Sequence, residues 1–256
     1  MEVLPEYLYG SYSGLAVSIF NLVPAVTAGI GMSAIPAIAR YCAAKDDRCL
    51  QRSVETVIAT TAAVAFPAGL GIFTFAEEIL SFLYPHQLME VAIVAPTLRM
   101  MGVVTILISF AGIFNNVLQA SGMERTPLTA LLIGGVLKMA TNYILVSRPE
   151  INIHGVAYGN LLCYSFIVLY CAIHWFGSGR PFARAVIMLK PGAAAIICCL
   201  LAHMFYSLLF DRVGNAISLL IAIAAGGIVY AVMLFWMKFI KSAEICVAFS
   251  GKNRRK

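Results

Sequence analysis

Seven long apolar stretches follow one another along this chain of 256 residues. A helix needs about 20 consecutive apolar residues to cross a hydrocarbon core of roughly 30 Å. We therefore predict seven membrane spans. They cover residues 14–40, 54–75, 101–120, 127–146, 156–176, 191–210 and 216–237.

The composition supports a membrane location and an all-α fold. Hydrophobic residues make up 61% of the chain and charged residues 12%, about half the charged share of a soluble domain. Lipid offers no hydrogen-bond partner to an open strand edge, and the alternating pattern of barrel strands is absent. We expect a polytopic transmembrane helical bundle.

Connections between the spans are short, so we predict a single membrane domain over residues 1–256. The longest inner connection is "YCAAKDDRCLQRS". The longest outer one, residues 76–100, mixes Glu77, Glu78 and Glu90 with apolar residues, and we expect part of it to form an interfacial helix. Pro24 and Pro36 predict a kinked first span.

Basic residues are distributed unequally between the two sides of the predicted bundle. Arg99, Arg148 and Arg212 lie on one side, whereas fourteen Lys and Arg residues lie on the other. By the positive-inside rule, the N-terminus lies outside and the tail "GKNRRK" in the cytoplasm. The net charge of +6 therefore reports topology and gives no reason to expect a nucleic-acid partner.

Motifs for catalysis, metal binding or cofactor binding are missing from the sequence. It contains no HExxH pair, no Asp-rich diphosphate motif and no Gly-rich phosphate loop. The seven cysteines have no zinc-like spacing, and none falls in a predicted outer loop, so free thiols are expected. We expect no enzymatic activity, catalytic residue, metal site or cofactor.

Lys138 lies near the middle of a predicted span, within "GGVLKMATNYILV". Helical spacing places Gly134, Gly135, Thr141 and Asn142 on its side of the helix. No span carries a carboxylate in its central part. The ammonium group therefore loses its proton, meets water, or finds an anion from outside this chain. The alternatives for its role are an anionic ligand contact and a bond to helix carbonyls at a packing interface.

Further polar side chains occur in two other spans. In "FNNVLQASG", Asn115 and Gln119 could either join helices or contact a ligand. Asn21 lies one turn before Pro24, where it could satisfy carbonyls that the proline leaves unpaired. The predicted substrate-binding residues are Lys138, Asn142, Asn115, Gln119 and Asn21. His203, deep in a late span, is interpreted as a packing residue, with a proton relay as the alternative.

Several segments together resemble a known family. "LYGSYSGLAVSIFNLVPAVTAGIGMSAIPAIAR", "AFPAGLGI", "NNVLQASGMERTP" and "LIGGVLKMATNYILVSRPEINIHGVAYGNLLCY" are similar to parts of the stage V sporulation protein B and polysaccharide-exporter family. That family shares a superfamily with the MurJ-type lipid II flippases and the MATE multidrug exporters. Residues 8–176 carry the specific motifs, and the likeness continues to residue 240 mainly as hydropathy.

The resemblance implies a fold of two six-helix lobes around a central cavity, with two added C-terminal helices. This chain then corresponds to spans eight to fourteen: core helices of the C-terminal lobe over 8–176, and two additional helices with a basic tail over 177–256. The N-terminal lobe would be missing, or supplied by a partner subunit. Lys138 and Asn142 match the family pattern in span eleven. The cavity arginine of lipid II flippases has no counterpart in "SIFNLVP".

The function implied is export of lipid-linked oligosaccharide or peptidoglycan precursors across the bacterial plasma membrane by alternating access. Such transport serves polysaccharide, cell-wall or sporulation pathways. A lipid-linked saccharide and the bilayer would be the partners. Two alternatives remain open, a cation-coupled multidrug exporter and a non-transporting scaffold for cell-envelope enzymes.

Overall fold

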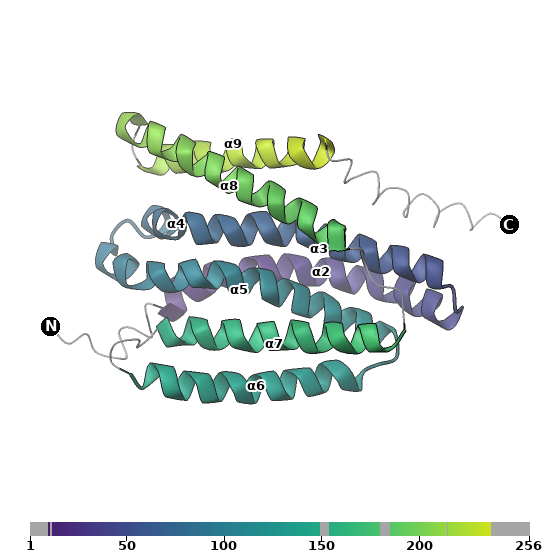
Figure 1. Ribbon diagram of the computed structural model, residues 1–256. Coiled ribbons are helices and arrows are strands. Elements are labelled where there is room, and N and C mark those ends of the chain that lie inside the picture. Colours follow the sequence, from purple (N-terminus) through teal and green to yellow (C-terminus); the bar gives the residue numbers. More distant parts are fainter. Residues whose placement is uncertain (1–9, 11, 149–153, 180–184, 214, 237–256) are drawn as a thin grey trace.

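The computed structural model describes residues 10, 12–148, 154–179, 185–213 and 215–236. Within these residues every regular element is a helix (Figure 1). In chain order they are η1 (Tyr12–Ala16), α2 (Val17–Ala43), α3 (Asp47–Thr74), α4 (Ala76–Leu83), α5 (Leu88–Ala120), α6 (Arg125–Val146), α7 (Gly155–Gly177), α8 (Ala185–Val213) and α9 (Asn215–Trp236). The all-α prediction is confirmed.

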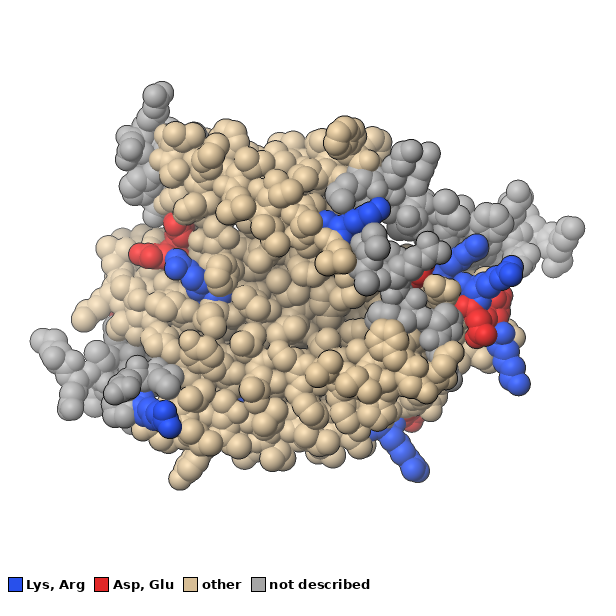
Figure 2. All heavy atoms as spheres, in the orientation of Figure 1, with Lys and Arg blue, Asp and Glu red and all other residues tan. Residues whose placement is uncertain are grey.

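Seven of these helical segments are long and apolar enough to span a membrane, as predicted. Figure 2 shows most Lys, Arg, Asp and Glu atoms toward the two ends of the helices, with an uncharged belt between them. Many large apolar side chains in that belt are exposed, including Leu132, Met139 and Leu200. In water such a surface would be unfavourable, whereas in a bilayer it faces lipid.

The helices extend beyond the predicted hydrocarbon segments at several ends. Helix α3 begins at Asp47 because the side chain of Asp46 caps it, accepting the Cys49 N–H at 3.1 Å. The connection between α3 and α5, predicted to be an outer one, contains the short amphipathic helix α4, which buries Ala76 and Leu80 and exposes Glu77. Helix α5 then begins at Leu88, so the third span continues well past its apolar core.

Helices α2, α3, α5 and α7 form the centre of the bundle, with α6 outside α7 (Figure 1). Their shared core includes Ile58, Phe110, Ile167 and Trp175. Helix α2 remains helical through Pro24 and Pro36. The hydroxyl of Thr27 donates to the carbonyls of Val23 and Pro24, both at 3.2 Å.

Glycines allow close contact between several helices. A Cβ at Gly102 of α5 would lie 2.5 Å from the carbonyl oxygen of Gly69 on α3, so the two backbones touch at this point. Small residues of this kind commonly permit close packing in membranes.

Helices α8 and α9 form a hairpin that packs on α3 (Figure 1). The Cys198 thiol donates to the Gly226 carbonyl within the hairpin, at 2.6 Å. The Tyr230 hydroxyl donates to the Ala63 carbonyl on α3 at 3.1 Å. The first bond joins α8 to α9, and the second holds the hairpin against α3.

Candidate substrate-binding residues

Lys138 lies on α6, half-buried, on the side of that helix that faces α7. Gly134, Lys138 and Asn142 follow one another at intervals of four residues and therefore share one face. Gly134 is buried beside α7, where an added Cβ would lie 3.0 Å from Ile167 and 3.3 Å from Cys163. Cys163 is also close enough to Lys138 for an electrostatic interaction. Gly134 and Lys138 of the predicted polar stripe therefore lie toward α7, whereas a Cβ at Gly135 would meet nothing within 4 Å.

Asn142 brings α6 and α7 into close contact at the next turn. A Cβ at Gly159 on α7 would collide with the Oδ1 atom of Asn142. This Oδ1 atom is buried, and no donor among the described residues reaches it. Thr141 instead uses its hydroxyl on the Leu137 carbonyl at 2.8 Å. Asn142 thus contributes to helix packing and retains an unused acceptor.

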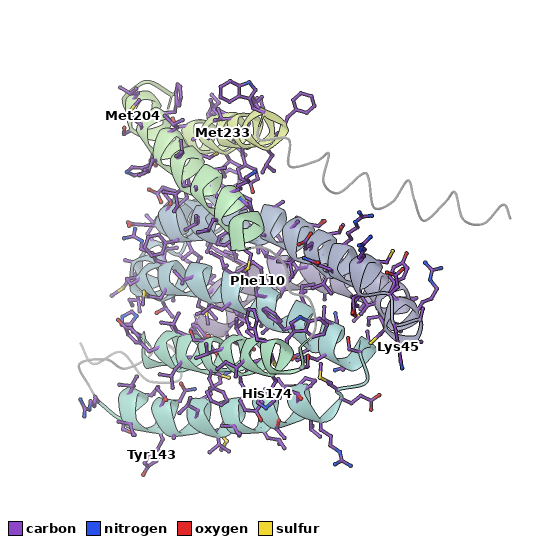
Figure 3. All side chains as sticks on the ribbon, turned by 45° about the vertical axis from the view of Figure 1, so that its right-hand side comes forward. Lys45, Phe110, Tyr143, His174, Met204 and Met233 are labelled. Atoms are coloured by element: carbon purple, nitrogen blue, oxygen red, sulfur yellow. The ribbon has the colours of Figure 1, made fainter. Side chains whose placement is uncertain are left out.

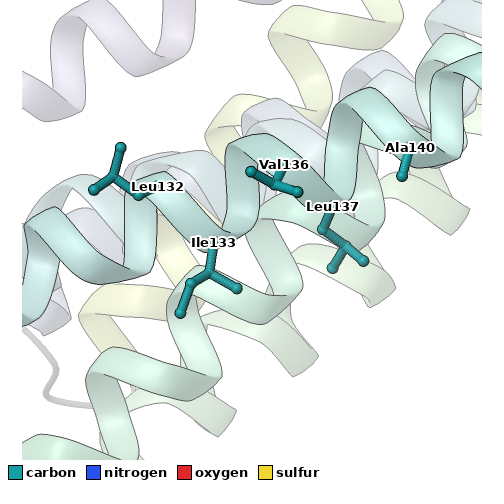
Figure 4. A pocket seen from close by; sticks show the side chains of 5 residues that line it. All are labelled: Leu132, Ile133, Val136, Leu137 and Ala140. Carbon is teal, nitrogen blue, oxygen red and sulfur yellow. The ribbon is translucent and has the colours of Figure 1, made fainter.

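The opposite face of α6 is apolar. A hollow of about 390 Å³ lies along it, lined by Leu132, Ile133, Val136, Leu137 and Ala140 (Figure 4). Tyr143 is 80% exposed and points away from the bundle (Figure 3). Only 11% of the spanning part of α6 is buried, the lowest share of the seven spans. This face suits lipid chains and offers nothing to a charged group.

Asn115 and Gln119 on α5 have different surroundings. The Oδ1 atom of Asn115 accepts the Cys171 thiol of α7 at 3.7 Å. Its neighbour Asn116 lies against Gly31 of α2, where an added Cβ would collide with the amide. Gln119 is exposed near the end of α5. Of the two roles expected for Asn115, joining helices or contacting a ligand, the hydrogen bond between α5 and α7 corresponds to the first.

Asn21 is exposed on α2, apart from the residues around α6. Helix α2 packs mainly on α3 and α5, whereas α6 packs mainly on α7. The hydroxyl of Thr27 donates to the carbonyls of Val23 and Pro24, whereas the carbonyl that loses its helical donor at Pro24 is that of Phe20. The structure therefore brings Lys138 and Asn142 together and does not place Asn21 beside them. The substrate-binding role of all five residues stays a prediction.

A carboxylate partner for Lys138 is not found among the described residues. Their Asp and Glu side chains lie toward the helix ends, and none forms an ion pair with Lys138. The described part of the chain also contains no group of three His, Cys, Asp or Glu residues that could hold a metal. Six described cysteines are free, and Cys246 lies outside the described residues. Among the described residues, Lys138 therefore has no ion-pair partner.

Sequence reasoning missed a second polar location, which we call the Arg99 pocket. It is a hollow of about 430 Å³ between α3, α5 and α8. Its polar lining comes from Thr74, Arg99 and His203, and the rest is mainly apolar. From the sequence, Arg99 is predicted only to report topology, and His203 is predicted to be a packing residue, with a proton relay as the alternative. No local motif joins three residues that lie so far apart along the chain.

Comparison with known proteins assigns this fold to a family. The MatE family model matches residues 11–144, which is just over half of the chain. The chain belongs to the MatE family. The predicted membership of the flippase and exporter superfamily is thereby confirmed.

One curated relative in this superfamily is the stage V sporulation protein B of Bacillus subtilis (strain 168). It is 22% identical over 240 residues, which cover 93% of this chain and 45% of the relative. The chain therefore spans about half the length of the relative that it matches.

Solved structures of MatE-type proteins share the fold. The lipid II flippase MurJ in an inward closed conformation matches with a TM-score of 0.71 and 18% identity, over 92% of this chain and 48% of that one. A MATE structure in the bent conformation matches with a TM-score of 0.56 and 17% identity, over 94% and 61% of the two chains. At these identities the likeness shows the fold alone.

Proposed function

We propose that this MatE chain is one lobe of a transporter that moves lipid-linked saccharide precursors across the bacterial plasma membrane by alternating access. The substrate class is an undecaprenyl-type lipid that carries an oligosaccharide or a peptidoglycan precursor. The observation that carries the proposal is Lys138, an intramembrane cation that pairs with no described carboxylate.

An unpaired charge inside a membrane is costly and usually marks a functional site. A lysine ammonium is a compact cation that suits the oxygens of a phosphate. The Oδ1 atom of Asn142, one helical turn from Lys138, is buried and accepts no hydrogen bond from a described residue, so we infer that it is an acceptor for a sugar hydroxyl. Together the two residues fit a ligand that carries both phosphate and hydroxyl groups.

The proposal includes a second lobe that completes the cavity. The second lobe is proposed because this chain covers only about half the length of its relatives. Leu22, Val26 and Met32 leave α2 with a largely exposed face, together with Asn21. We infer that this face lines the cavity opposite the other lobe.

We also infer the orientation of the chain in the membrane. Described basic residues at the end of the bundle that carries the α2–α3 connection include Arg40, Lys45, Arg48 and Arg52, whereas the other end carries Arg99 and Arg148. The positive-inside rule then places the first end in the cytoplasm.

The test uses the assembly as it exists in the cell. The tagged chain is purified from native membranes with whatever lobe accompanies it and reconstituted in vesicles, where flipping of a fluorescent lipid-linked oligosaccharide is measured. Lys138→Ala should abolish flipping, and Lys138→Arg should retain part of it. If Lys138→Ala flips like the wild type, Lys138 has no ligand role.

A cation-coupled multidrug exporter is the second candidate, favoured by the likeness to MATE structures. Such exporters commonly use intramembrane carboxylates, which a second lobe would have to supply. Drug resistance that rises with expression of the assembly, without lipid flipping, would favour this candidate.

A further inference from the structure

The Arg99 pocket has the form of a site for an amphiphile. Its lining includes Arg99, His203 and Thr74, whose side chains carry a guanidinium, an imidazole and a hydroxyl. Leu70 and Phe73 of α3 and Ile196 and Leu200 of α8 supply an apolar wall. A ligand bound here would meet a cationic side chain and several apolar side chains. The hollow along α6 has a similar volume, but only apolar side chains line it.

Arg99 is an exposed cation with no ion pair among the described residues. Acidic atoms do appear at this end of the bundle (Figure 2). Glu77 and Glu78 lie close enough to Tyr206 of α8 for an electrostatic interaction, and among the described residues neither forms an ion pair with Arg99. A planar guanidinium can bind two oxygens of a phosphate at once. Arg99 is therefore free to bind an anionic group that arrives at the pocket.

The pocket also lies at a suitable depth. Arg99 precedes the third apolar segment, residues 101–120, by two positions, and Thr74 is the last residue of α3. His203 lies in the second half of α8, which runs toward the same end of the bundle. Arg99 and Thr74 therefore lie at the edge of the hydrocarbon core, beside the headgroup region, with His203 further inside its span, and the apolar wall continues toward the core.

We propose that the Arg99 pocket binds an anionic lipid, with its phosphate on Arg99 and His203 and the start of its chain on the apolar wall. This site is distinct from Lys138 and does not depend on the proposed transport function. The phosphate could belong to a bilayer phospholipid or to a polyprenyl carrier, because both present the same chemistry to the pocket.

Native mass spectrometry of the full chain in micelles measures this binding directly. Three probes are titrated: dioleoyl phosphatidylglycerol, undecaprenyl phosphate and the zwitterionic dioleoyl phosphatidylcholine. Arg99→Gln should weaken binding of the anionic probes about tenfold, the order expected for a lost charged hydrogen bond. Arg99→Lys should weaken it less. Selective retention of phosphatidylglycerol would identify a bilayer lipid, and selective retention of undecaprenyl phosphate a carrier lipid.

Arg148→Gln is the matched control, because Arg148 is an exposed arginine at the same end of the bundle but at the end of α6. It should leave binding unchanged. His203→Gln, which keeps a polar side chain, provides a second variant if Arg99→Gln unfolds, and should weaken the anionic probes only. Equal losses in the Arg99 and Arg148 variants, or equal affinity for all three probes, would overturn the proposal.

Discussion

Replacement of Gly102 by alanine should separate α3 from α5. The added Cβ would lie 2.5 Å from the Gly69 carbonyl oxygen and 2.6 Å from the Phe73 backbone nitrogen. Ordinary contact begins at 3.4 Å, so the shortfall at the oxygen is 3.4 minus 2.5, or 0.9 Å. Both obstacles are backbone atoms, which cannot move aside by a change of rotamer.

The expected cost follows from that displacement. Overpacking in a well-packed core typically costs about 1–3 kcal/mol. We expect Gly102→Ala to fall in the upper part of that range, because a whole helix must shift and its neighbours lose contacts along its length. Gly69→Ala meets the Gly102 carbonyl oxygen at 2.6 Å and should behave similarly.

Two other glycines on the same helices provide the controls. A Cβ at Gly71 of α3 or Gly112 of α5 meets nothing within 4 Å. Alanine at these positions should be neutral or stabilising by up to about 1 kcal/mol, because alanine is the better helix former. The assay is unfolding of the purified chain in mixed micelles by increasing dodecyl sulfate, followed by circular dichroism. A Gly102→Ala midpoint equal to that of Gly112→Ala would refute the close backbone contact.

Three further predictions concern single contacts. Gly159→Ala should destabilise the α6–α7 contact, and adding Asn142→Ala should restore stability, since the amide is the obstacle; two additive losses in a double-mutant cycle would contradict this. Tyr230→Phe should lower the free energy of unfolding by about 0.5–1.5 kcal/mol through loss of the bond to α3, and an unchanged unfolding midpoint would contradict it. The backbone N–H of Cys49 donates a hydrogen bond to the Asp46 carboxylate and holds the pKa of that carboxyl below the usual 3.8. The capping bond therefore stabilises the folded chain fully above that pH, and this stabilisation is lost as the carboxylate is protonated. The stability difference between the wild type and Asp46→Ala should therefore narrow from pH 7 to pH 3, and a constant difference in thermal midpoint would argue against the charged cap.

The number and type of helices could be predicted because the bilayer imposes one solution on a long apolar segment. The helix ends could not, since an apolar window detects only the part inside the hydrocarbon. Helix α3 starts at Asp47 with a polar turn, and α5 starts at Leu88 with a mainly apolar segment interrupted by Glu90 and Arg99, so neither start shows in an uninterrupted apolar window.

For the candidate site, the sequence could predict which residues share a helix face. Periodicity correctly grouped Gly134, Lys138 and Asn142 on one face, but periodicity does not say which helix that face meets. The structure supplies α7 as the neighbour. The Arg99 pocket could not be predicted, because it depends on where the α8–α9 hairpin lies against α3 and α5.

The central claim is that the chain works as one lobe of a lipid-linked saccharide flippase. The most direct measurement is the rate at which a fluorescent lipid-linked oligosaccharide becomes accessible to an external quencher in vesicles that contain the chain with its native companion lobe, compared with vesicles that contain the chain alone. The account predicts flipping by the two-lobe assembly and none by the single chain. Equal rates in both preparations, or an assembly that extrudes cationic drugs and leaves the lipid unmoved, would contradict it.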